Sequence, residues 1–473
     1  MKAQTRRPRK GEELELTIER LDAKGQGVGF WPADGEDARR ERVRVRGGLP
    51  GARLRVAVLR KRKGALDARP LDQLAPSPNA VPPRCPHTSS CGGCSLQELE
   101  YGAQLEALQE LFERTLAPLL DVAPCEVTPI VGADEPFGYR NKMDFTFASR
   151  RWVEPDEPEG VDASFAVGLH VRGLYRKVLD VERCEIAFPG ASAILGTARQ
   201  LARERGLTPW DLEAHTGLLR HLVLRRSEAT GEVLVHLVTS DETPAEVEPY
   251  ARAILARHPE IATLVHSVST RAATVAVGES ERVLAGSGWI EERLAGLSFR
   301  VSAGSFFQTN TRQAERLAAL VRERAGAGEM VYDLCCGAGA LGLAVTAGSD
   351  RRLFGFELVP EAVADARWNA ERNGLGAATF VEGDLAETLP GGSYPPPDVC
   401  LADPPRAGLH PKVVAELRRL APPRLVYVSC NPAAAVRDLV PLVEDGYAVR
   451  SIEPLDLFPH TPHLECVVTL ERP

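Results

Sequence analysis

The sequence predicts a multidomain α/β protein whose last part is an open, mostly parallel sheet. Three observations support this prediction. The chain has 473 residues, enough for about three domains. Its 44% hydrophobic and 26% charged residues are typical of a globular protein. From about residue 295 onward, short apolar segments alternate with stretches of helical periodicity, which indicates repeated strand–helix units.

The first 70 residues are expected to form a small, basic β-barrel. Alternating apolar residues such as Leu14, Leu16 and Ile18 indicate half-buried strands. This segment holds 19 Lys and Arg against 10 Asp and Glu, which gives it a net charge of +9. The whole chain has a net charge of −8, so the remaining residues carry −17. An oligonucleotide-binding barrel is the natural candidate, since a basic groove can bind phosphates. A solvated basic arm is the alternative.

A central domain is expected over residues 71–290. It opens with a proline-rich connector at 71–84, which a cysteine-containing segment follows. Apolar residues at three- and four-residue steps predict a helix from about 96 to 116, able to pack on the C-terminal domain, and Pro118 should end it. The apolar and basic run at 218–225 predicts a strand.

Four cysteines of this region form a candidate metal site. Cys85, Cys91 and Cys94 are closely spaced, and Cys184 follows much later. The basic N-terminus lacks the apolar segment of a secretory signal, so we expect a cytoplasmic, reducing environment in which thiols stay available for a metal. Four thiolates suit zinc or an iron–sulfur cluster, and spacing alone does not choose between them. Thiols without a metal are the alternative.

The C-terminal domain carries the features of a nucleoside pocket. The strand at 330–334 opens into a turn with Gly337 and Gly339, and ligands of such sheets bind at the carboxyl ends of strands. Glu357, Asp384 and Asp403 end the following strands. Glu357 is spaced to accept hydrogen bonds from ribose hydroxyls, and Asp384 is placed for an adenine amino group. We favour S-adenosylmethionine over NAD, because NAD requires neither Asp384 nor Asp403.

Two further residues are candidates for covalent chemistry. The strand at 425–429 delivers Cys430 to the same sheet edge, just before a helix whose N-terminus can lower the pKa of a thiol. Glu465 starts an apolar strand, where burial raises the pKa of a carboxyl toward that of a general base. An inert buried cysteine and a solvent-facing glutamate on an edge strand are the alternatives.

A thiolate, a carboxylate and a methyl donor together predict methylation of uracil at C5. Addition of the Cys430 sulfur to C6 makes C5 nucleophilic, and C5 then takes the methyl group. Glu465 removes the C5 proton and the thiol leaves by elimination. The target base must be single-stranded or flipped out of its stack for this chemistry.

With these residues in place, the sequence resembles the RNA (uracil-5-)-methyltransferases, in the iron–sulfur subgroup that acts on 23S ribosomal RNA and carries an N-terminal TRAM domain. The resemblance covers almost the whole chain. Its motifs are Gly25-x-Gly27-x-Gly29, Leu49-Pro50-Gly51, Tyr139-Arg140-Asn141-Lys142, Ser305-Phe306-Phe307-Gln308-Thr309-Asn310, Ser429-Cys430-Asn431-Pro432 and His463-Leu464-Glu465.

The resemblance implies a TRAM barrel over 1–70, a central domain with the cluster over 71–290 and a Rossmann-like methyltransferase domain over 291–473. It implies a [4Fe–4S] cluster on Cys85, Cys91, Cys94 and Cys184, with Cys430 as nucleophile and Glu465 as base. The implied donor-binding residues are Gln308, Cys335, Gly337, Gly339, Ala340, Glu357, Asp384 and Asp403. Cys335 replaces a usual aromatic residue and Ala340 a usual polar one. The implied partner is RNA, with 23S ribosomal RNA favoured, for a monomer without membrane attachment.

Other readings remain open. The substrate could be transfer RNA, or the protein could be a non-catalytic iron–sulfur RNA-binding protein. A 5-methylcytidine enzyme is disfavoured, because such enzymes place a cysteine just after the fourth-strand proline, where this chain has Arg406 after Pro405. An amino-methyltransferase with an aromatic residue at this point is disfavoured for the same reason.

Overall fold

The structure is a computed structural model that describes residues 7–32, 40–62, 64–272, 275–276 and 278–472. The chain forms two compact units, which are described separately. The first unit comprises the chain up to residue 88 together with 94–117 and 458–464, and the second comprises 89–93, 118–457 and 465–473. Within the described ranges, no helix has the length and apolar character needed to cross a membrane.

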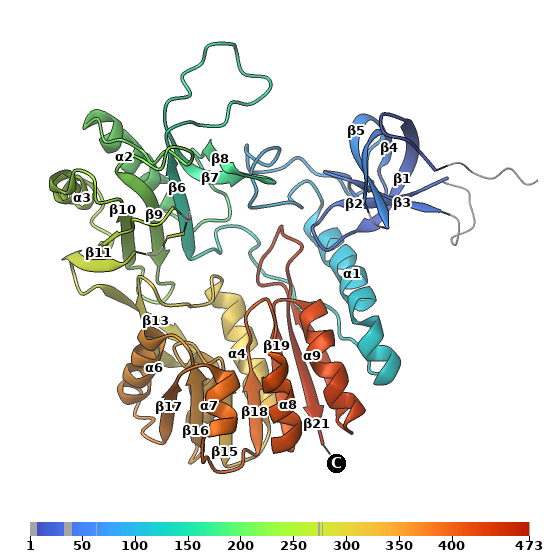
Figure 1. Ribbon diagram of the computed structural model, residues 1–473, viewed down its shortest axis with the longest axis vertical. Helices are drawn as coiled ribbons and strands as arrows, with labels where there is room; N and C mark the ends of the chain where they lie inside the picture. The colour runs from blue at the N-terminus through green and yellow to red at the C-terminus, as the bar shows by residue number, and fades with distance from the viewer. Residues whose placement is uncertain (1–6, 33–39, 63, 273–274, 277, 473) are drawn as a thin grey trace, which may run out of the picture. The chain divides into compact units, whose positions relative to one another are not determined.

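The first unit contains the barrel that the sequence predicts. Five strands close in the order β1-β2-β3-β5-β4 (Figure 1). They are β1 (Glu13–Leu21), β2 (Gly27–Trp31), β3 (Glu41–Val45), β4 (Arg53–Arg62) and β5 (Ala65–Ala75). The alternating side chains of β1, Leu14, Leu16 and Ile18, point into the barrel core. Gly27 has to be glycine, since a Cβ there would lie 2.4 Å from the carbonyl oxygen of Gly48.

Helix α1 (Tyr101–Val122) differs from the prediction at both ends. It begins later than residue 96, because Leu96 starts a turn in which its carbonyl accepts from the Leu99 N–H at 3.0 Å. It also continues past Pro118, so the expected stop there is wrong. A proline removes one backbone donor, but Leu116 and Leu119 on either side are both fully buried. Burial of this apolar face outweighs the missing hydrogen bond.

A mixed seven-stranded sheet forms the central part of the second unit, in the order β12-β11-β10-β9-β6-β7-β8. Its strands are β6 (Lys142–Ala148), β7 (Ala166–Val171), β8 (Leu174–Asp180), β9 (Leu219–Arg226), β10 (Val233–Thr239), β11 (Ile261–Val268) and β12 (Ser280–Ala285). Strand β9 confirms the strand predicted at 218–225. Helices α2 (Ala191–Glu204) and α3 (Val247–Leu255), the latter preceded by the 3-10 turn η2 (Pro244–Glu246), share one apolar core with the sheet, formed by residues such as Phe145, Leu222 and Tyr250.

The C-terminal sheet has seven strands in the order β17-β16-β15-β18-β19-β21-β20. They are β15 (Met330–Leu334), β16 (Arg352–Glu357), β17 (Ala378–Glu382), β18 (Val399–Ala402), β19 (Arg424–Ser429), β20 (Ala448–Leu455) and β21 (Glu465–Glu471). The first five in this order are parallel, and β21 runs antiparallel to both β19 and β20. The predicted open, mostly parallel sheet is confirmed.

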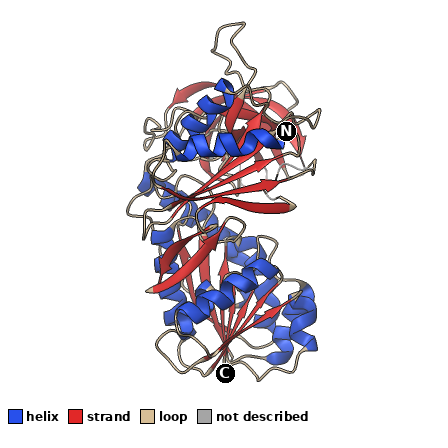
Figure 2. Ribbon diagram, turned by 90° about the vertical axis from the view of Figure 1, so that its left-hand side faces the viewer, coloured by secondary structure: helices blue, strands red, loops and turns tan. Residues whose placement is uncertain are grey.

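Helices cover both faces of this sheet (Figure 2). They are α4 (Thr311–Ala325), α5 (Ala340–Thr346), α6 (Pro360–Arg372), α7 (Leu385–Gly391), α8 (Pro411–Leu420) and α9 (Pro432–Glu444). A hairpin of β13 (Trp289–Leu294) and β14 (Leu297–Ser302) precedes α4. Because the parallel strands all end at one edge, the residues that follow them gather there.

Candidate active site

The turn after β15 is shaped to bring its backbone close to a ligand. Cys335, Gly337 and Gly339 all adopt positive φ values, of 62°, 54° and 81°. Gly342, at the start of α5, donates its N–H to Asp333 Oδ2 at 2.9 Å, and a Cβ at Gly342 would lie 2.6 Å from that oxygen. The glycines therefore serve both the left-handed turn and the close packing of α5 on the sheet.

Two carboxylates next to this turn are oriented by backbone donors. Glu357, at the end of β16, accepts one hydrogen bond from Gly337 N and one from Val359 N, both at 2.9 Å. Asp384 caps α7 by accepting from Ala386 N at 2.8 Å. Each carboxylate keeps lone pairs for further donors, and the contacts of Glu357 with a ribose and of Asp384 with an adenine amino group stay predictions. We call Glu357 and Asp384 the donor half of the sheet edge, after the methyl donor that is predicted to bind there.

The segment that carries Gln308 is fastened to the central sheet. Asn141, just before β6, donates its side-chain N–H groups to the Gln308 carbonyl and to Thr311 Oγ1, each at 2.9 Å. The Asn141 backbone N–H donates to the Thr309 carbonyl, also at 2.9 Å, and Arg225 donates to the Ser305 carbonyl. Sequence reasoning found the motif around Asn141 but missed this function, because its partner lies 167 residues away.

Strand register brings three reactive side chains to the same edge. Ala402 pairs with Tyr427, which places Asp403 and Cys430 after the ends of neighbouring parallel strands. Ser429 pairs with Cys466 in the antiparallel partner, so Glu465 begins its strand where β19 ends. We call Asp403, Cys430 and Glu465 the reaction half of the sheet edge.

Glu465 is buried, with 2% of its surface exposed, on the interior strand β21. The alternative of a solvent-facing glutamate on an edge strand is therefore wrong. Burial, reinforced by the like charge of Asp403, raises the pKa of Glu465 well above its ordinary value, while Arg406 opposes this shift. Burial also raises the pKa of Asp403 to about 6. Burial at this edge therefore shifts both carboxyl groups toward the protonated form.

Cys430 does not have the lowered pKa that the sequence predicted. Burial, followed by the charges of Glu465 and Asp403, raises the pKa of this half-buried thiol to about 11, and Arg406 acts in the opposite direction. The prediction relied on the N-terminus of α9, whose effect is small compared with burial beside two carboxyl groups. The prediction of a lowered pKa is therefore wrong.

The predicted metal ligands are Cys85 and Cys94, in the first compact unit, and Cys91 and Cys184, in the second. The first three cysteines of the sequence are buried and Cys184 is half-buried. The Cys91 sulfur accepts a hydrogen bond from the Gly93 N–H at 3.3 Å. In the part of the chain that the structure describes, no three His, Cys, Asp or Glu side chains are grouped as ligands of a metal. The metal site thus rests on cysteine spacing alone.

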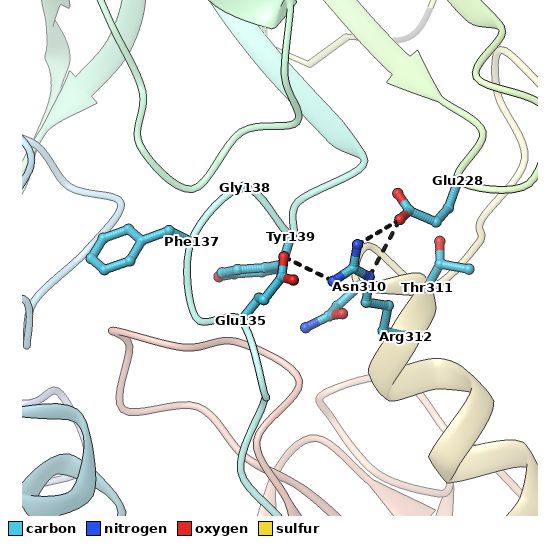
Figure 3. Close-up of a pocket in the computed structure, with 8 residues that line it drawn as sticks. All are labelled: Glu135, Phe137, Gly138, Tyr139, Glu228, Asn310, Thr311 and Arg312. Atoms are coloured by element: carbon cyan, nitrogen blue, oxygen red, sulfur yellow. Dashed lines mark hydrogen bonds and ion pairs between the residues drawn. The ribbon is translucent and has the colours of Figure 1, made fainter.

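A separate hollow lies beside the start of α4. Figure 3 shows its lining residues, which are Glu135, Phe137, Gly138, Tyr139, Glu228, Asn310, Thr311 and Arg312. Arg312 reaches across it and forms ion pairs with Glu135 at 2.8 Å and Glu228 at 3.0 Å. None of the predicted site residues lines this hollow, and its one cation is already neutralised, so we assign it no role in the reaction.

Comparisons with known proteins agree with this geometry. The tRNA (uracil-5-)-methyltransferase family matches residues 393–473, and the methyltransferase small domain family matches residues 297–426. An uncharacterized RNA methyltransferase of Chlorobaculum tepidum is 38% identical over 98% of this chain and 98% of its own length. One of Porphyromonas gingivalis is 38% identical over 89% of this chain and 94% of its own.

One solved structure matches nearly the whole chain. It is the tRNA (uracil-54, C5)-methyltransferase of Pyrococcus abyssi in complex with S-adenosyl-L-homocysteine, with a TM-score of 0.76 and 28% identity over 97% of this chain and 100% of that one. Together with the sheet edge described above, these matches show that the chain belongs to the RNA methyltransferases, and that its residues 393–473 are similar to the tRNA (uracil-5-)-methyltransferase family.

Proposed function

We propose that this enzyme methylates uridine at C5 in 23S ribosomal RNA, with Cys430 as nucleophile and Glu465 as general base. The observation that carries the proposal is the strand register that places Cys430, Glu465 and Asp403 at one edge of the sheet. A nucleophile and a base must both reach one pyrimidine ring, and this edge supplies both.

Each residue has a defined task in the proposed reaction. The Cys430 sulfur adds to C6 of the uracil and the ring becomes an enolate, whose C5 is nucleophilic. S-adenosylmethionine, held by Gln308, Glu357, Asp384 and the glycine turn, supplies the methyl group when bound. Glu465 then takes the C5 proton, and the C6–S bond breaks to restore the ring and the thiolate. The raised pKa of Glu465 suits this task, since a more basic carboxylate removes a proton more readily.

The test separates the two roles by trapping the covalent intermediate. Uracil-containing RNA and the methyl donor are incubated with wild type, Cys430→Ala or Glu465→Gln, and mass spectrometry follows both methyl transfer and protein–RNA adducts. We expect Glu465→Gln to accumulate an adduct and Cys430→Ala to form neither adduct nor product. Methyl transfer by Cys430→Ala would contradict the mechanism, and no activity in wild type would favour a non-catalytic RNA-binding protein.

Transfer RNA is the second candidate substrate, because the Pyrococcus abyssi enzyme named above acts on uracil 54 of tRNA. Substrate choice depends on RNA shape, which no motif encodes. Mapping 5-methyluridine in ribosomal and transfer RNA from cells with and without the gene decides between them. If 5-methyluridine disappears from 23S RNA without the gene, the proposal is supported. If it disappears from transfer RNA alone, the proposal is contradicted.

The proposal includes a cytoplasmic monomer with three domains, over 1–70, 71–290 and 291–473. In it, the barrel acts as a TRAM domain that binds RNA, and Cys85, Cys91, Cys94 and Cys184 hold a [4Fe–4S] cluster or, alternatively, zinc. Methyl transfer needs no redox step, so the proposed cluster has a structural role. Metal analysis and the absorbance of anaerobically purified protein test this. About four iron atoms per chain support the cluster, one zinc supports the alternative and neither metal contradicts both.

A further inference from the structure

A cation lies beside the reaction half of the sheet edge. Arg406 follows Asp403-Pro404-Pro405 in the loop after β18, and its side chain is exposed. In the part of the chain that the structure describes, its guanidinium forms no hydrogen bond or ion pair with another side chain. Most arginines of the surrounding domain differ in this respect, as with Arg418, which is paired with Asp445. Arg406 therefore keeps its full charge available to the reaction centre.

The backbone of this loop is fixed by the helix that follows Cys430. Asn431 donates its side-chain N–H to the Arg406 carbonyl at 2.8 Å. Arg437 donates to the next carbonyl, of Ala407, at 2.7 Å. Asp438 accepts from Leu409 N at 2.6 Å and is itself held by the Tyr427 hydroxyl at the same distance. Three successive points of the loop are thus attached to α9 or its N-cap, which fixes Arg406 close to the residue that precedes Asn431, namely Cys430.

The charged groups that act on Cys430 come from three elements. Glu465 faces it from β21 and Asp403 from the end of β18, and both disfavour a thiolate. Arg406, from the loop after β18, favours it and also favours the charged form of Glu465. The charge of Cys430 contributes to the raised pKa of Cys466, the neighbour of Glu465, but Cys466 lies fully buried in β21. Of these groups, Arg406 alone supplies a positive charge.

We propose that Arg406 is a positioning residue that stabilises the thiolate of Cys430 in the enzyme before RNA binds. This inference rests on the proposed function, in which Cys430 is the nucleophile. In the step concerned, the S–H bond breaks, the electron pair stays on Sγ and the proton passes to solvent. The guanidinium extends from a backbone that the hydrogen bonds of its loop hold, and its charge offsets the negative charge of the neighbouring carboxyl groups, so that more of the enzyme carries the reactive thiolate.

Alkylation of Cys430 in the absence of RNA tests this role directly. Wild type, Arg406→Gln, Arg406→Lys and Arg418→Gln react with iodoacetamide from pH 6.5 to 10.5, and mass spectrometry of the Cys430 peptide gives the rate at that one cysteine. Arg418→Gln is the matched control, because it removes an exposed arginine of the same domain.

We expect Arg406→Gln to slow alkylation of Cys430 across this range, which lies below the Cys430 pKa of about 11, because removing one nearby positive charge typically raises the pKa of a thiol by about one pH unit. Well below the midpoint the rate should fall only about threefold, because the more basic thiolate is also more nucleophilic. Arg406→Lys should restore most of the profile, and Arg418→Gln should match wild type.

An unchanged profile in Arg406→Gln, with a higher KM for RNA, would overturn the inference and show that Arg406 only binds the substrate. Arg406→Ala is a second neutral variant, and thermal unfolding checks that both variants are folded. Failure of the proposed function has a different signature, since Cys430→Ala would then retain methyl transfer whatever Arg406 does.

Discussion

The acidic side chains of the donor half and of the reaction half lie in different environments, although both halves belong to the same sheet edge. Glu357 and Asp384 are oriented by backbone N–H donors, which fixes where their lone pairs point. Asp403 and Glu465 are instead placed where burial raises their pKa values. The comparison teaches that one edge of a sheet can hold acids that backbone donors orient and acids whose pKa burial raises, and that the local environment, not residue type, separates the two.

The largest effect should come from pH, because it acts on the reaction half. The pKa of Cys430 is raised to about 11 and that of Glu465 is raised too, and in the proposed mechanism both groups must lose a proton before they act as nucleophile and base. The single-turnover rate should therefore rise with pH by about tenfold per unit between pH 6 and 8 if one proton limits the rate. Quenched-flow methylation assays measure this, and a flat profile over that range would contradict the raised pKa values.

Glu357→Gln should act on the donor half alone. The amide keeps one acceptor oxygen but loses the charge, so the proposed contact to ribose hydroxyls should weaken while the reaction half stays intact. We expect KM for the methyl donor to rise about tenfold with kcat reduced less than threefold. Glu361→Gln, an exposed glutamate at the start of α6, is the control. If Glu357→Gln lowered kcat as much as Glu465→Gln does, the proposed separation of the two halves into methyl-donor binding and reaction would be contradicted.

Asn141→Ala should give the smallest effect, because it would act on binding of the methyl donor only through Gln308, a proposed donor-binding residue. The variant removes the side-chain hydrogen bonds to the Gln308 carbonyl and Thr311 but leaves the backbone bond to Thr309 in place. One or two such bonds contribute about 1 kcal/mol each, so KM for the donor should rise about fivefold. Isothermal titration with S-adenosyl-L-homocysteine measures the same loss, and an unchanged affinity would show that the segment is held by other contacts.

The sequence predicts the strands of the C-terminal sheet well, because periodicity and glycine turns are local signals. Residues at strand ends, such as Glu357 and Cys430, could be placed for the same reason. The sign of the Cys430 pKa shift could not be predicted, because burial and the charge of Glu465 come from strands distant in sequence. The continuation of α1 through Pro118 was missed likewise, since it depends on tertiary burial of Leu119.

The segment 458–464 belongs to the barrel unit although the chain on both sides of it belongs to the other unit. The His460 carbonyl accepts from Ser95 N at 2.9 Å and Leu96 N at 3.0 Å, and the next strand begins with Glu465. A truncated enzyme that lacks the first hundred residues would lose these two hydrogen bonds to the His460 carbonyl. The turn at Ser95 and Leu96, outside the barrel strands, therefore anchors the segment that leads directly into the proposed catalytic base.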